Sequence, residues 1–136
     1  MNTNYSVWHS EVRNYELDYQ RIVNNAVYFN YLDYARAIYL KQFNFDDVKA
    51  AESAINIVLI DTHIRYIKSL ISGDKFYVDT KLVRTSKLKF VFKQKIILDS
   101  SEELILEADS IACCVDARTG KVCLSDELAK IEIKLI

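Results

Sequence analysis

Hydrophobic residues crowd one segment near the N-terminus at a spacing typical of a helix. Asn24 and Asn25 can cap a helix, and Ala26 to Phe43 then runs without Gly or Pro. Its apolar side chains cover nearly every direction around a 3.6-residue turn, and a helix that is apolar almost all round is buried. Because Asp33 and Arg36 would be costly inside a membrane, the pattern predicts a long helix enclosed by protein.

Most of the remaining chain has the composition and alternation of β-strands. Before the helix, imperfect alternation from Val7 to Asp18 predicts a strand that ends near Asp18. After a polar connector at 46–53, which we expect to be helical, Ser72-Gly73-Asp74 and Asp99-Ser100-Ser101 are turn signals. The further strands predicted by the pattern are 55–68, 76–83, 88–98, 104–115, 122–124 and 129–135.

The segment 88–98 shows the alternation most clearly. Its apolar residues point one way and its lysines the other, as in an antiparallel strand with one face on a core and one in water. The apolar set is Leu88, Phe90, Phe92, Ile96 and Leu98, and the basic set is Lys87, Lys89, Lys93 and Lys95. One strand, one buried helix and a strand meander predict an α+β domain. We expect an antiparallel sheet of five to six strands wrapped around one long central helix.

Composition narrows the class of protein further. The 136 residues, 51% apolar and 27% charged, fit one globular domain covering 1–136. The net charge of −1 gives no global attraction to nucleic acid. There is no long uncharged apolar run and no basic apolar leader, so we expect no membrane span and no signal peptide. Three cysteines without C-x-x-C spacing favour a reducing, cytoplasmic location.

Several chemistries find no support in the sequence. Two glycines leave no P-loop or dinucleotide-binding motif, and no serine stands in a G-x-S-x-G elbow. His9 and His63 have no second ligand at metal-binding spacing, and we expect neither a metal nor another cofactor. Cys113 and Cys114 lie on a predicted strand, where core packing is the simplest role.

Asp18 is the most promising catalytic candidate. It lies between the first predicted strand and the N-terminus of the buried helix. Unpaired backbone N–H groups and the positive end of the helix dipole suit a developing oxyanion there. A nearby carboxylate can act as a general base or a nucleophile toward a bound carbonyl. From the residues alone, a loop or capping acid remains the alternative.

The segment Asp18-Tyr-Gln-Arg-Ile-Val-Asn-Asn-Ala-Val-Tyr28 resembles the signature of hot-dog-fold acyl thioesterases of the 4-hydroxybenzoyl-CoA thioesterase-like group. With the preceding Val-Arg-Asn-Tyr-Glu-Leu it is especially similar to the plant acyl-lipid thioesterase and methylketone-synthase-type branch. Two weaker matches follow in the same order, at 60–74 and 114–121. The resemblance implies a helix as the "sausage" and strands as the "bun".

The resemblance also implies a site and a reaction. Asp18 would be the catalytic carboxylate, and the backbone N–H of Asn25 would bind the carbonyl of an acyl-CoA or acyl-carrier-protein thioester. Either an activated water or Asp18 itself would then expel the thiolate. Asn24, Tyr28 and Tyr31 would contact the substrate. Members of the group are homodimers or homotetramers with sites at the dimer interface and sheets joined edge to edge.

A basic run follows the third predicted strand at Arg84-Thr-Ser-Lys87. One hypothesis is that Arg84, Ser86 and Lys87 hold the phosphates of coenzyme A or the acidic surface of an acyl carrier protein. The alternative is a solvated edge that discourages misassembly.

Two positions depart from the family pattern. Arg21 stands where Gly is common, and Ile22 stands where one branch has His. A hot-dog hydratase or dehydratase normally needs a loop His, so Ile22 disfavours that activity. A non-catalytic acyl-thioester-binding module on the same scaffold is the other alternative.

Overall fold

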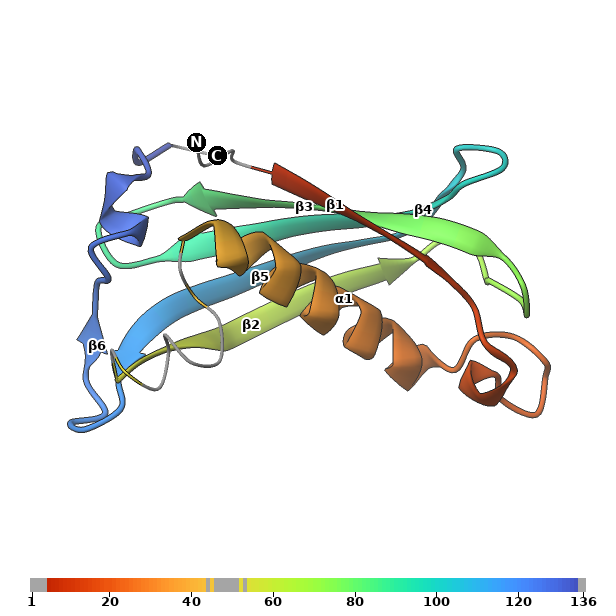
Figure 1. Ribbon diagram of the computed structural model, residues 1–136, viewed down its shortest axis with the longest axis horizontal. Helices are drawn as coiled ribbons and strands as arrows, with labels where there is room; N and C mark the ends of the chain where they lie inside the picture. Colours follow the sequence, from red (N-terminus) through yellow and green to blue (C-terminus); the bar gives the residue numbers. More distant parts are fainter. Residues whose placement is uncertain (1–4, 44, 46–51, 53, 135–136) are drawn as a thin grey trace.

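The computed structural model describes residues 5–43, 45, 52 and 54–134. One antiparallel sheet of six strands forms the frame, with strand order β1-β3-β4-β5-β2 and β6 paired to β5 (Figure 1). The strands are β1 (Tyr5–Glu11), β2 (Ile55–Tyr66), β3 (Lys75–Arg84), β4 (Phe90–Leu98), β5 (Leu104–Asp116) and β6 (Val122–Cys123). The α+β class and the strand number predicted from the sequence are confirmed.

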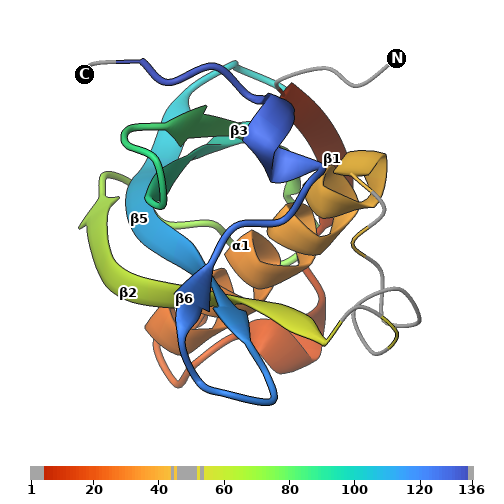
Figure 2. The ribbon, with the colours of Figure 1, turned by 90° about the vertical axis from the view of Figure 1, so that its left-hand side faces the viewer.

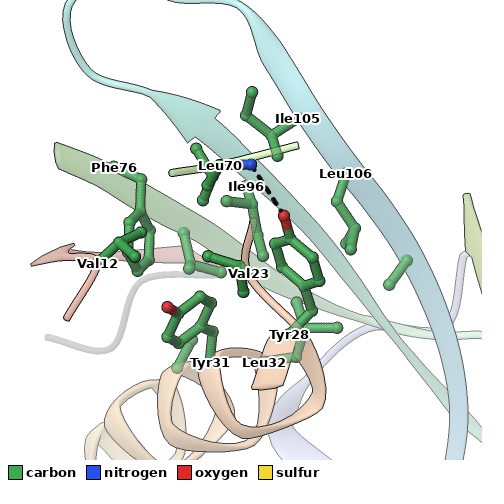
Figure 3. Packing of buried hydrophobic residues seen from close by; sticks show 13 residues of the cluster. Val12, Val23, Tyr28, Tyr31, Leu32, Leu70, Phe76, Ile96, Ile105 and Leu106 are labelled. Atoms are coloured by element: carbon green, nitrogen blue, oxygen red, sulfur yellow. Dashed lines mark hydrogen bonds between the residues drawn. The ribbon is translucent and has the colours of Figure 1, made fainter. Parts of the chain in front are cut away.

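The helix α1 (Asn25–Leu40) lies along the concave side of the sheet, which arches around it from β1 to β2 (Figure 2). Two apolar clusters fill the space between helix and sheet. At the N-terminal half of the helix, buried side chains from α1 meet those of β3, β4 and β5 (Figure 3). At the C-terminal half, Tyr39 and Phe43 pack with Leu82, Phe92 and Leu128.

The start of α1 follows from its cap. The side-chain oxygen of Asn24 accepts a hydrogen bond from the N–H of Ala26 at 2.8 Å, as predicted for an N-cap residue. The helix ends at Leu40, and a 3-10 turn (Lys41–Phe43) continues the chain. The predicted helix is therefore confirmed, with its last turn in the tighter form.

Enclosure of the helix on all sides is not what the structure shows. Within α1, Phe29 is 51% exposed and Tyr34 is 50% exposed. A single sheet covers one side of a helix, so the remaining apolar face stays open in one chain. The prediction of an all-round buried helix is wrong for the single chain.

Three predicted strand boundaries also need correction. β1 ends at Glu11, before the 3-10 helix η1 (Asn14–Glu16), and does not reach Asp18. β4 begins at Phe90, because residues 85–89 form a turn closed by the hydrogen bond from Thr85 N–H to the carbonyl of Lys89. The predicted strand at 129–135 is replaced by the 3-10 helix η3 (Leu128–Lys130) and one bridge further on.

The other strands at 55–68, 76–83, 104–115 and 122–124 are confirmed as β2, β3, β5 and β6. The turn at 72–74 is confirmed as well, with Gly73 at a φ of 84°. The polar connector at 46–53 lies outside the described residues, apart from residue 52.

Candidate active site

A tight hairpin joins η1 to α1 and brings Asp18 to the start of the helix. The N–H of Asp18 donates to the carbonyl of Ile22 at 2.9 Å, and Leu17 pairs with Val23 in an antiparallel bridge. The N–H of Asn24 closes the hairpin on the carbonyl of Glu16 at 3.0 Å. Asp18 therefore lies across the hairpin from Ile22 and Val23, the two residues that precede the helix cap Asn24.

The carboxylate of Asp18 uses only part of its hydrogen-bonding capacity. One oxygen accepts a hydrogen bond from the N–H of Gln20 at 2.8 Å, which fixes the side chain over the hairpin tip. Within the described part of the chain, the second oxygen has no hydrogen-bond partner. A half-buried carboxylate with one free oxygen can take a proton or attack an electrophile.

The helix N-terminus offers one free donor. The cap residue Asn24 occupies the next two N–H groups: its side chain accepts from Ala26 and its carbonyl accepts from Val27, both at 2.8 Å. Across residues 5–43 and 54–134, nothing accepts from the N–H of Asn25. This donor lies on an exposed residue at the positive end of the helix dipole, where it can bind a carbonyl oxygen that gains charge.

Two predicted substrate contacts, Tyr28 and Tyr31, lie in the core beneath this end of the helix. The hydroxyl of Tyr28 accepts a hydrogen bond from the N–H of Leu70 at 3.1 Å and so anchors the loop after β2 (Figure 3). The hydroxyl of Tyr31 donates to Glu16 at 2.8 Å. Burial is the main cause that raises the pKa of both tyrosines. Both side chains therefore support the site from below.

The end of β3 and the turn between β3 and β4, which carry Arg84, Ser86 and Lys87, lie at the opposite end of the molecule from the start of α1 (Figure 1). The guanidinium of Arg84 is buried and donates to the carbonyls of Ala129, Ile131 and Lys87 at 3.1, 3.0 and 2.8 Å. Backbone carbonyls thus occupy both of its terminal nitrogens, so the expected contact of Arg84 with a ligand phosphate stays a prediction that would need these bonds to be exchanged. Ser86 and Lys87 stay exposed, in the turn between β3 and β4.

Sequence reasoning missed Glu16. Glu16 is only 6% exposed and lines an open pocket of about 510 Å³ between β1 and α1. The pocket is lined by Trp8, Ser10, Arg13, Glu16, Asn30, Tyr31 and Tyr34. The only signal in the sequence is a Glu three residues after Arg13, a spacing that lets a carboxylate bond back to the first N–H of a turn.

The described residues contain no group of three or more His, Cys, Asp or Glu side chains placed to hold a metal ion. None of their helices is both long and apolar enough to cross a membrane.

Comparison with known proteins gives a consistent result. The chain matches the Thioesterase-like superfamily over residues 12–131. It is 35% identical over 106 residues to the chloroplastic acyl-acyl carrier protein thioesterase ATL3 of Arabidopsis thaliana. The aligned region covers 78% of this chain and 56% of that protein. The chain thus spans little more than half the length of this relative. It is also 27% identical over 111 residues to the long-chain acyl-CoA thioesterase FadM of Escherichia coli, covering 82% and 83% of the two chains.

Solved structures show the same fold. A 1,4-dihydroxy-2-naphthoyl-CoA thioesterase from Synechocystis superposes with a TM-score of 0.82 at 15% identity, over 90% of this chain and 91% of that chain. A protein from Aquifex aeolicus superposes with a TM-score of 0.77 at 27% identity, over 86% and 90%. The antiparallel sheet around one main helix is the hot-dog fold expected from the sequence.

Proposed function

The chain belongs to the Thioesterase-like superfamily, and from this premise we propose that it hydrolyses acyl-CoA or acyl-carrier-protein thioesters to the free acid and the thiol. The named activities of its plant and bacterial relatives support this substrate class. Long acyl groups are favoured, because one of these relatives is named as a long-chain acyl-CoA thioesterase.

The observation that carries the proposal is that the hairpin holding the partly free carboxylate of Asp18 leads directly into the helix start, where the N–H of Asn25 is free. The Asn25 N–H would bind the thioester carbonyl and stabilise negative charge as it develops on the oxygen. Asp18 would then act in one of two ways. As a general base it takes a proton from the attacking water; as a nucleophile it forms a mixed anhydride that water later hydrolyses. In both routes the carbon–sulfur bond breaks and the thiolate leaves.

Asn24 contributes indirectly to this chemistry. Its side chain and carbonyl take up the neighbouring N–H groups, so the N–H of Asn25 is the one left for a ligand. Tyr28 and Tyr31 would shape the apolar floor under the acyl group. Ser86 and Lys87 remain candidates for contact with the carrier, provided that a second copy of the chain brings them near an Asp18.

We further propose that the protein is a homodimer joined along β2. This strand ends the sheet, and within the described chain it pairs only with β5. Val58, Leu59 and Ile60 form an exposed apolar run on it. Such an edge invites pairing with another strand, and a second copy would cover it.

The test is thiol release from a panel of acyl-CoA and acyl-carrier-protein thioesters by the wild type and by Asp18→Asn. We expect the wild type to hydrolyse some of them and the variant to be slower by about a hundredfold or more, since general-base catalysis contributes on that scale. Asp126→Asn is the matched control, because Asp126 is an exposed aspartate near η3, far from the hairpin. Its rate should equal that of the wild type.

Wild-type release by Asp18→Asn would remove Asp18 from the mechanism. If the wild type released thiol from none of the thioesters, the proposed hydrolysis would be wrong and a binding role would replace it.

A further inference from the structure

Glu16 is a buried residue whose carboxylate takes no part in the proposed reaction. It ends the 3-10 helix η1, two residues before Asp18, and its side chain is almost fully shielded from solvent. Buried carboxylates are rare unless they are paired, so the contacts of this one show what it holds in place.

The side chain of Glu16 is fully engaged. One carboxylate oxygen accepts the N–H of Arg13 and the hydroxyl of Tyr31, both at 2.8 Å. The other oxygen accepts the Arg13 guanidinium at 3.0 Å. These contacts compensate the charge and tie the turn that precedes Asp18 to the helix α1.

The backbone of Glu16 makes a second attachment to the same helix. Its carbonyl accepts the N–H of Asn24, the cap residue, at 3.0 Å. Asn24 and Tyr31 are seven residues apart, which is about 10 Å along a helix axis. One residue therefore holds α1 at two separate points, and two points fix both the position and the direction of the helix relative to the hairpin.

We propose that Glu16 is the positioning residue of the proposed site. It fixes the hairpin that carries Asp18 against the end of the helix that presents the Asn25 N–H. Glu16 does not contact the substrate. The inference rests on the proposed function, because it concerns the alignment of the two groups assigned there to catalysis. A misplacement of about 1 Å between such groups can lower a rate by about a hundredfold.

Two variants test the attachment. Tyr31→Phe removes only the hydroxyl that donates to Glu16, and Glu16→Gln keeps the shape while it removes the charge. Tyr39→Phe is the matched control: Tyr39 is a second buried tyrosine of α1, and it packs in the other apolar cluster, with Phe43 and Phe92.

The measurement is steady-state hydrolysis of the best thioester, with circular dichroism to establish the folded fraction of each protein. We expect Tyr31→Phe and Glu16→Gln to lower kcat by about tenfold to a hundredfold while KM changes by less than about threefold. Tyr39→Phe should keep kcat within about twofold of the wild type. A purely structural role would lower the melting temperature and leave the kcat of the folded protein unchanged.

The possible failures are distinct. Wild-type kcat in both folded variants, beside an inactive Asp18→Asn, would overturn the role of Glu16 and leave the proposed function standing. If Glu16→Gln does not fold, Tyr31→Phe alone decides. If the wild type hydrolyses no thioester, the proposed function fails and the inference fails with it.

Discussion

At the scale of single residues, Arg21 shows what the Asp18 hairpin requires of its sequence. Arg21 follows the tip with a φ of 66°, and its N–H donates to the carbonyl of Asp18 at 3.0 Å. This left-handed conformation costs a residue with a Cβ about 1–2 kcal/mol, and glycine escapes that cost. The family resemblance places Gly at this position, and the geometry supplies the physical reason.

We expect Arg21→Gly to raise the free energy of unfolding by about 0.5–1 kcal/mol, because the gain in the folded state exceeds the loss from a more flexible unfolded chain. Urea denaturation measures the change. Gly73→Ala is the reciprocal control: Gly73 has a φ of 84°, and an added Cβ would meet nothing within 4 Å. It should lose about 1 kcal/mol from backbone conformation alone. A destabilised Arg21→Gly would mean that the arginine side chain, not the backbone, stabilises this loop.

At the scale of secondary-structure elements, Arg84 joins the end of β3 to the C-terminal segment. Its side chain binds the carbonyls of Ala129 and Ile131, and its own carbonyl accepts the N–H of Lys134 at 2.7 Å. The alternating pattern at 129–135 looked like a strand from the sequence. The segment is instead held mainly by one arginine, so it needs no regular ladder.

We expect Arg84→Met to lower the free energy of unfolding by about 2 kcal/mol, since hydrogen bonds to charged groups contribute on that scale. Hydrogen exchange should speed up in residues 128–134 more than in the sheet. Lys87→Met, the same substitution on an exposed lysine of the adjacent turn, should change stability by less than about 0.5 kcal/mol. Equal KM values for acyl-CoA in Arg84→Met and the wild type would agree with the buried position of Arg84. A large rise in KM with normal stability would place Arg84 in the binding site.

At the scale of the whole molecule, a single chain leaves large apolar side chains exposed to water. Such side chains lie on the open face of α1 and in the exposed run on β2. Asp18 and the turn that holds Ser86 and Lys87 also lie at opposite ends of the helix. A dimer would cover the first two features, and the sequence-based expectation that two chains share each site stays a prediction.

We expect Ile60→Lys to shift the protein from dimer to monomer, because Ile60 is 56% exposed on β2 and a lysine there opposes strand pairing. Light scattering after gel filtration measures the mass. Val7→Lys is the control, since Val7 is 42% exposed on β1, the strand at the other edge of the sheet. A monomer from Val7→Lys with an intact dimer from Ile60→Lys would place the interface at β1 instead.

Local chemistry in the sequence determined much of this protein. The start of α1 followed from the Asn24 cap, and its end was predicted to within one turn from the uninterrupted helical spacing. The strands β2, β3, β5 and β6 followed from alternation and turn residues. These signals act between neighbours in the chain, so they can be read without a structure. The hot-dog fold and the family were also within reach, because the motif from Asp18 to Tyr28 is local. The cytoplasmic location and the absence of a cofactor stay predictions.

The tertiary structure decided which side chains meet. The sequence does not single out Glu16, yet it is buried and bonded to Tyr31, fifteen residues away. Arg84 looked like a ligand for phosphate, yet it binds carbonyls more than forty residues further along the chain. Polar groups in loops reveal no partner through periodicity, because their partners are set by how the helix, the hairpin and the C-terminal segment pack. That packing buries Glu16, Tyr28 and Tyr31 beneath the site, and it leaves Asp18 and the N–H of Asn25 available to a ligand.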